Sequence, residues 1–116
     1  MVPGHRHERL ADQIRTEIAS LIEGELKDPR IGFVTVTHVE VSPDLGHARV
    51  FVSVLGDDEA REQSMAGLGS AAGYVRRAVA QRLRLRRAPE LLFAFDAGAE
   101  KAERIEDLLN RLRREP

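Results

Sequence analysis

Apolar residues recur at three- and four-residue intervals in the first part of the chain, the spacing that places them on one side of a helix. The pattern runs from His5 to Glu25, with the apolar positions Leu10, Ile14, Ile18, Leu21, Ile22 and Leu26. The sequence Lys27-Asp28-Pro29-Arg30 ends it, because Pro29 restricts the backbone of the residue before it. We therefore predict an amphipathic first helix that stops before Gly32.

Two stretches rich in β-branched residues come next and are typical of strands. In residues 33–42, FVTVTHVEVS, the apolar positions change parity between Val36 and Val39, which predicts a β-bulge or two partly covered faces. Residues 42–46 have Pro and Asp where a type I turn favours them, so residues 47–55 should return antiparallel. The inner face of this second strand is predicted to be Ala48, Val50, Val52 and Val54.

A second helical region follows Gly56, and either Asp57 or Asp58 is expected to cap it. Met65 and Leu68 should face the core. Three glycines also fall in this region, where each costs about 1 kcal/mol relative to Ala; they are Gly67, Gly69 and Gly73. We interpret them as a kink or helix-to-helix joint near residues 71–73. At Gly73 we expect a backbone conformation or close approach that a side chain would obstruct.

Beyond the joint, residues 70–95 read SAAGYVRRAVAQRLRLRRAPELLFAF. At a helix's angular step, one side carries Val75, Ala78, Val79 and Leu83, and another carries Arg76, Arg77, Arg84 and Arg87. Arg82 falls on the apolar side, so it must snorkel, pair with a carboxylate or mark the frayed end. Pro89 then ends the helix and leads into a third strand, ELLFAF.

A last helix is expected to start at residues 96–98, with an apolar stripe of Ala102, Ile105, Leu108, Leu109 and Leu112. The predicted order is therefore α-β-β-α-(kink)-α-β-α. An antiparallel hairpin and a third strand, with helices on one face, make an α+β two-layer fold. The 116 residues suffice for one core, and no linker divides them, so we expect a single domain over residues 1–116.

The distribution of charge along the chain says more about function than the overall composition does. Residues 1–70 hold seven basic against twelve acidic side chains, whereas residues 71–96 hold six against two. An isolated run of arginines is usually a solvated face, but this concentration in a chain of net charge −1 favours a site for a polyanion. The absence of cysteine and of an N-terminal apolar run predicts a reducing, cytoplasmic location, and no apolar run is long enough to span a membrane.

The candidate chemistry is sparse. His5 with His7 near the start, or His38 with His47 if they lie opposite one another across the hairpin, could chelate a metal ion, but surface histidines explain both pairs and we predict no metal site. No Walker-type loop is present. The few aromatic residues argue against a base-stacking platform. Tyr74 either stacks on an exposed base or braces the joint as a half-buried ring.

Several segments together resemble the ribosome-binding factor A family: DPRIGFVTVTHVEVSPDL, SAAGYVRR, LRLRRAPELLFAFD and RIEDLL, in family order over nearly the entire chain. The resemblance implies a type II K-homology-like fold in which an Ala-x-Gly kink, matched by residues 71–73, replaces the G-x-x-G of other RNA-binding domains. It implies binding to the immature small (30S) ribosomal subunit and help in late maturation of 16S rRNA. One departure is Gly98, which stands where the family often has a capping Ser and should weaken that cap.

The resemblance also implies no catalysis, no cofactor, a monomer and, for release, an assembly GTPase. Shape and phosphate recognition suits a folded ribosomal RNA. The candidate RNA-binding residues are Ala71, Ala72, Gly73, Tyr74, Arg76, Arg77, Arg84, Arg86 and Arg87. Two alternatives remain open: an adaptor that docks on a ribosomal or other acidic protein without touching RNA, and an RNA-processing enzyme.

Overall fold

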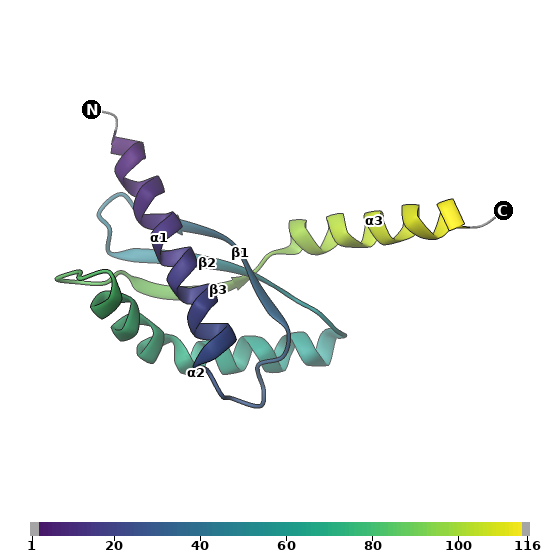
Figure 1. Ribbon diagram of the computed structural model, residues 1–116, viewed down its shortest axis with the longest axis horizontal. Coiled ribbons are helices and arrows are strands. Elements are labelled where there is room, and N and C mark those ends of the chain that lie inside the picture. Colours follow the sequence, from purple (N-terminus) through teal and green to yellow (C-terminus); the bar gives the residue numbers. More distant parts are fainter. Residues whose placement is uncertain (1–2, 115–116) are drawn as a thin grey trace.

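The computed structural model describes residues 3–114, apart from the side chains of residues 3–6, 100, 102–104, 107 and 114. The elements in chain order are α1 (Pro3–Gly24), β1 (Val34–Val41), β2 (His47–Val54), α2 (Asp58–Arg82), β3 (Glu90–Phe95) and α3 (Ala97–Arg114) (Figure 1). β1 and β2 pair antiparallel, and β3 lies parallel to β2 on its other side. α1 packs mainly against β1, and α2 against β3. The predicted two-layer α+β architecture is confirmed.

The core lies between the sheet and these two helices. The alternating residues predicted for the inner face of β2 are all buried, and so are the inward positions of the helices: Ile14, Ile18 and Leu21 on α1, and Leu68, Val75 and Val79 on α2. Leu10, Ile22, Leu26, Met65, Ala78 and Leu83 pack around this cluster. The hydrophobic pattern of the chain therefore predicts correctly which face of each of these elements is inside.

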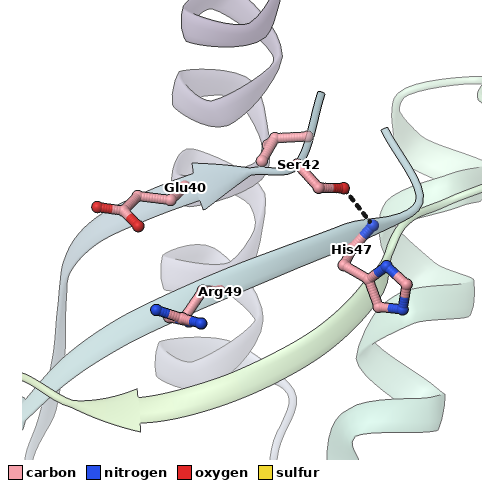
Figure 2. Close-up of a pocket in the computed structure, with 5 residues that line it drawn as sticks. Glu40, Ser42, His47 and Arg49 are labelled. Carbon is pink, nitrogen blue, oxygen red and sulfur yellow. Dashed lines mark hydrogen bonds between the residues drawn. The ribbon is translucent and has the colours of Figure 1, made fainter. Parts of the chain in front are cut away.

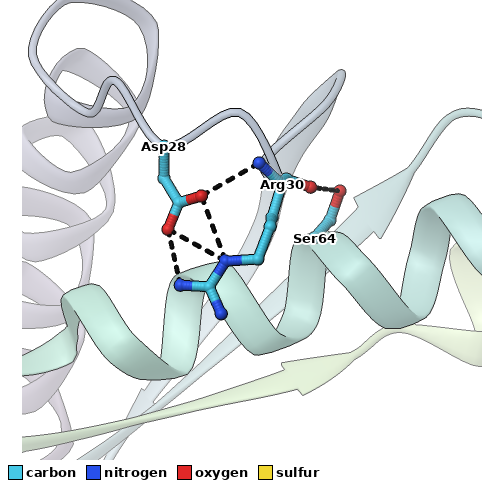
Figure 3. Close-up of polar contacts among 3 residues, drawn as sticks. All are labelled: Asp28, Arg30 and Ser64. Atoms are coloured by element: carbon cyan, nitrogen blue, oxygen red, sulfur yellow. Dashed lines mark hydrogen bonds and ion pairs between the residues drawn. The ribbon is translucent and has the colours of Figure 1, made fainter.

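The loop that follows α1 is fastened to α2 by three polar residues (Figure 3). The backbone N–H and Nε of Arg30 donate to Asp28 Oδ1 at 2.9 and 3.1 Å, and Nη2 donates to Oδ2 at 2.7 Å. These bonds, chiefly from the guanidinium, lower the pKa of Asp28. The buried hydroxyl of Ser64 on α2 donates to the Arg30 carbonyl and accepts from Gly32 N–H at 3.0 Å. The break between α1 and β1 is thus a fixed turn.

The predicted β-bulge is present at Thr37, because the pairing register shifts between Val36 and His38. The extra residue directs its hydroxyl to Asp96, at the end of β3, and donates to Oδ2 at 2.6 Å. The other oxygen of Asp96 accepts from Ala99 N–H at 3.0 Å and so caps α3. The expectation that Gly98 weakens this cap is wrong, because Asp96 supplies it.

α3 extends away from the rest of the molecule (Figure 1). Its apolar stripe is exposed: the fractions are 52% at Ile105, 59% at Leu108, 47% at Leu109 and 60% at Leu112. Ala102, also expected in this stripe, has its side chain outside the described part of the structure. The helical layer on the sheet is therefore formed by α1 and α2.

α2 is one helix over 25 residues, not two, although its axis changes direction along its length (Figure 1). Asp57 caps it, accepting from Ala60 N–H at 2.8 Å.

The three glycines of α2 do not share one explanation. Gly67 is buried, and a Cβ there would lie 2.7 Å from Ile31 Cγ1 in the loop held by Ser64. A Cβ at Gly69 would meet nothing within 4 Å. Gly67 is therefore a packing requirement of the α1–β1 loop.

The C-terminal end of α2 is a Schellman motif. Leu85 N–H bonds to the Ala80 carbonyl at 2.9 Å, and Arg84 N–H bonds to the Gln81 carbonyl at 3.3 Å. Arg84 has φ of 53° in this motif, at the position that usually holds glycine. The placement of Arg84 and Arg87 on one helical face is thus corrected: the helix ends at Arg82, and both arginines lie in the following loop.

Gly67, which is buried, and Gly69, which is exposed, allow a matched test of the packing role. We expect Gly69→Ala to raise the free energy of unfolding by about 1 kcal/mol, because it removes a flexible residue from a helix and fills open space. Gly67→Ala should lower it instead, because overpacking against Ile31 costs roughly 1–3 kcal/mol and exceeds the helical gain. Urea denaturation of both variants measures the difference. Equal stabilisation would show that the loop gives way at no cost.

Arg84→Gly should stabilise the protein. The left-handed conformation costs a non-glycine residue about 1–2 kcal/mol, and the greater flexibility of glycine in the unfolded chain offsets part of this, so we expect a net gain of roughly 0.5–1 kcal/mol. Arg86→Gly is the control, since Arg86 lies in the same loop without a positive φ and should lose stability. Thermal melting of both decides; a loss at Arg84 would contradict the capping role.

Candidate nucleic-acid interface

The loop after α2 returns along the helix and encloses a shallow pocket of about 320 Å³ with it. Four arginines line this pocket, two from the helix and two from the loop, around a floor of small residues. The lining is Gly73, Arg76, Arg77, Ala80, Arg86, Arg87 and Ala88. We call these seven residues the arginine pocket. Since no carboxylate lines it, the charged groups of the pocket lining are all positive, which favours the approach of an anion.

Arg76 holds the two walls of the arginine pocket together. Its Nε and Nη2 both donate to the carbonyl of Ala88, each at 3.1 Å. Ala88 and the following Pro89 are buried, so the loop is fixed at this end by packing as well. Arg76 therefore positions the loop, and Arg77, Arg86 and Arg87 are the arginines of the pocket whose side chains are free of such a bond among the described residues.

Gly73 has an ordinary helical backbone, because the positive φ values of the described glycines are confined to Gly56. A Cβ at position 73 would meet Arg77 Nη1 at 3.5 Å, which is ordinary contact with the end of a flexible side chain. The expectation of a special backbone conformation or an obstructing neighbour within the chain is wrong. Gly73 instead lines the pocket beside the end of the Arg77 side chain.

Tyr74 and Arg82 face α1 and bind carboxylates of that helix and of the residue directly after it. Tyr74 Oη donates to Glu25 Oε2 at 3.1 Å, and this bond raises the pKa of the phenol. Arg82 forms ion pairs with Glu25 and, at 3.5 Å, with Glu17. Of the three outcomes that the sequence left open for Arg82, pairing with carboxylates is the observed one. Tyr74, with 46% of its surface exposed, braces α2 against α1.

The pocket brings together five of the nine predicted residues: Gly73, Arg76, Arg77, Arg86 and Arg87. Ala71, Ala72, Tyr74 and Arg84 do not line it; Ala71 packs against the core. Ala80 and Ala88 were missed. Helical spacing could have found Ala80, which lies seven residues after Gly73 and three after Arg77 on the same face.

The histidines do not gather around a metal. In the β1–β2 pairing, His38 lies opposite Phe51 and stacks on it, with 6.0 Å between the ring centroids. In the β2–β3 pairing, His47 lies opposite Glu90, with 3.4 Å between His47 Nε2 and Glu90 Oε2. The two are thus not opposite one another. His7 bonds to the Pro43 carbonyl, and the side chain of His5 lies outside the described residues. Among the residues that the structure describes, no group of three or more His, Asp or Glu side chains has a metal-binding arrangement.

A second hollow of about 220 Å³ lies on the hairpin near its turn (Figure 2). Ser42 Oγ accepts from the His47 backbone N–H at 3.0 Å there, which closes the turn. Glu40 and Arg49 are cross-strand partners on the same face. Because a carboxylate and a guanidinium line this hollow together, it lacks the uniform positive charge of the arginine pocket.

In the part of the chain that the structure describes, no helix is long and apolar enough to cross a membrane.

Comparison with known sequences identifies a family. The family model for ribosome-binding factor A matches residues 6–109. The ribosome-binding factor A of Desulfitobacterium hafniense is 51% identical over 111 residues, which cover 96% of this chain and 89% of that protein.

Solved structures agree. A solution structure of a Thermotoga maritima protein, described as a putative ribosome-binding factor A, is 38% identical with a TM-score of 0.72 and covers 84% of this chain and 93% of that one. A homology model of the Thermus thermophilus factor, fitted into a cryo-EM map of a 30S complex, is 31% identical with a TM-score of 0.61 and covers 72% and 87%. The K-homology-like fold is thereby confirmed, and the chain belongs to the ribosome-binding factor A family.

Proposed function

We propose that this protein binds the immature small ribosomal subunit through its arginine pocket, which contacts the phosphate backbone of 16S rRNA, and that it assists late maturation of that RNA without catalysis. It acts as a monomer that an assembly GTPase releases. The observation that carries the proposal is the pocket itself, in which four arginines converge and no carboxylate is present.

The geometry favours phosphate recognition over base recognition. Arginine is suited to phosphate because its planar fork donates two parallel hydrogen bonds. Tyr74, the aromatic residue closest in sequence to the pocket, is occupied by Glu25, which leaves no stacking ring in the lining. The shape of a folded RNA must then supply the specificity, which suits a structured ribosomal surface. The relative from Thermus fitted into a map of a 30S complex supports the same partner.

A protein adaptor is the second candidate, and the exposed stripe of α3 favours it. Exposed apolar surface marks protein contact when it is contiguous. A pull-down of small subunits with and without nuclease separates the two functions. Loss of the protein after RNA digestion supports RNA contact, and its persistence supports the adaptor.

Reversing the charge of the free pocket arginines should abolish tight binding. We choose Arg77, Arg86 and Arg87→Glu, which leave the Arg76–Ala88 bond in place. Surface changes of this kind alter stability by about 0.5 kcal/mol each, so the protein should stay folded. If each arginine neutralises about one phosphate, the slope of log affinity against log salt should flatten by roughly two to three units. Circular dichroism and subunit binding across a salt series measure both effects.

The control reverses three exposed arginines elsewhere, Arg9, Arg15 and Arg49→Glu, and so changes the net charge equally. The control should weaken binding far less, and most of the slope of log affinity against log salt should remain. A folded pocket variant with wild-type affinity and slope would leave the pocket arginines as a solvated surface and end the proposal.

Gly73→Val should impair binding with little effect on folding, because the new side chain displaces the flexible end of Arg77 and takes up space in the pocket that a phosphate would occupy. Gly69→Val is the control: it makes the same change in the same helix, at a position that faces open space away from the pocket. Co-sedimentation with small subunits and thermal melting are measured for both. If the two variants lose affinity equally, the floor at Gly73 has no role in binding.

A further inference from the structure

Arg82 lies on α2, as two of the pocket arginines do, but its side chain has different partners. It lies six positions after Arg76 and five after Arg77, so it is more than 100° around the helix from both. It faces α1, where its Nη1 is 3.5 Å from Glu17 Oε2 and its Nη2 bonds to Glu25 Oε1. Two carboxylates thus surround one guanidinium, and the local charge on this side of α2 is negative.

Both oxygens of Glu25 are occupied, one by Arg82 and the other by the Tyr74 hydroxyl. This arrangement fixes the carboxylate in place at the end of α1. The side chains stay in contact with solvent, with 32% of Arg82, 27% of Glu17 and 43% of Glu25 exposed. A polyanion approaching α2 from the α1 side therefore reaches accessible carboxylates and a neutralised arginine, whereas from the other side it reaches the arginine pocket.

We propose that Glu17 and Glu25 are specificity-determining residues, which withdraw Arg82 from phosphate binding and confine an RNA backbone to the pocket side of α2. This rests on the proposed function. The two carboxylates would allow the protein to discriminate between its RNA site and unrelated RNA. With Arg82 available, α2 would present guanidinium groups on two sides and attract any RNA. With Arg82 masked, binding requires a phosphate that fits the pocket. We call the pair the acidic mask.

The test removes the acidic mask with the isosteric variant Glu17→Gln/Glu25→Gln. The probe is an unrelated RNA duplex of about 20 base pairs, measured beside small subunits across a salt series. One additional phosphate contact steepens the slope of log affinity against log salt by about one unit and raises affinity five- to tenfold near 0.1 M salt. We expect this gain on the unrelated duplex and a smaller gain on subunits, so that discrimination falls.

The control is Glu8→Gln/Glu23→Gln, which removes two exposed carboxylates from the same helix that form no ion pair among the described residues. It measures the general effect of lowering negative charge. Adding Arg82→Gln to the mask variant should return the duplex affinity and slope to those of the control. If the control gains as much as the mask variant, or if Arg82→Gln leaves the gain intact, the inference is wrong.

Arg82→Gln alone gives an independent measurement, compared with Arg9→Gln on α1. A masked arginine contributes nothing to the salt slope, so both variants should match the wild type; a slope lower by about one unit at Arg82 alone would overturn the inference. The outcome is separable from the proposed function. If the triple pocket variant binds subunits normally, the proposed function fails. If that variant loses binding while the mask variant equals its control, the acidic mask alone is refuted.

Discussion

The burial of Val75 and Val79 fixes the orientation of α2 and thereby determines which sides of the helix can contact other segments or a ligand. Both are fully buried between the helix and the sheet. Once they are fixed, the two remaining edges of the helix point toward α1 and toward the returning loop. The first edge receives Glu17 and Glu25, and the second meets Arg86 and Arg87. The opposite electrostatic character of the two edges therefore follows from one apolar stripe and from which segments lie beside it.

The arginine pocket has one rigid wall and one wall fastened to it. α2 supplies the rigid wall. The loop is fastened by a Schellman motif at one end, the buried Pro89 at the other and the bond from Arg76 to Ala88 between them. Preorganisation of this kind reduces the conformational entropy that binding must remove. Arg76, which donates two hydrogen bonds to the chain itself, thus contributes to the pocket by holding the loop with Arg86 and Arg87 in place.

Sequence patterns predicted the buried faces of α1, β2 and α2, because apolar periodicity reflects burial. The apolar stripe of α3 is the exception, since it is exposed. The change of parity in the first strand left a bulge or two partly covered faces open, and the structure has the bulge. The patterns failed where contacts depend on tertiary structure. The helix end at Arg82 was missed, since Arg84 adopts a conformation that arginine rarely favours. The division of the arginines into pocket and masked sets requires knowing that Glu17 and Glu25 lie beside Arg82, 65 and 57 residues away in the chain.

The glycines of α2 show why residue type alone leaves function undecided. Each weakens the helix by a similar amount. At Gly67 the space that a side chain would occupy is filled by Ile31. The loss of helix stability at Gly67 therefore allows the turn held by Asp28 and Ser64 to pack closely against α2. At Gly73 a side chain would meet only the flexible end of Arg77, in the lining of the arginine pocket. No packing contact among the described residues requires glycine at position 73. Under the proposed function, the small residue leaves room for a group that enters the arginine pocket and approaches the helix closely.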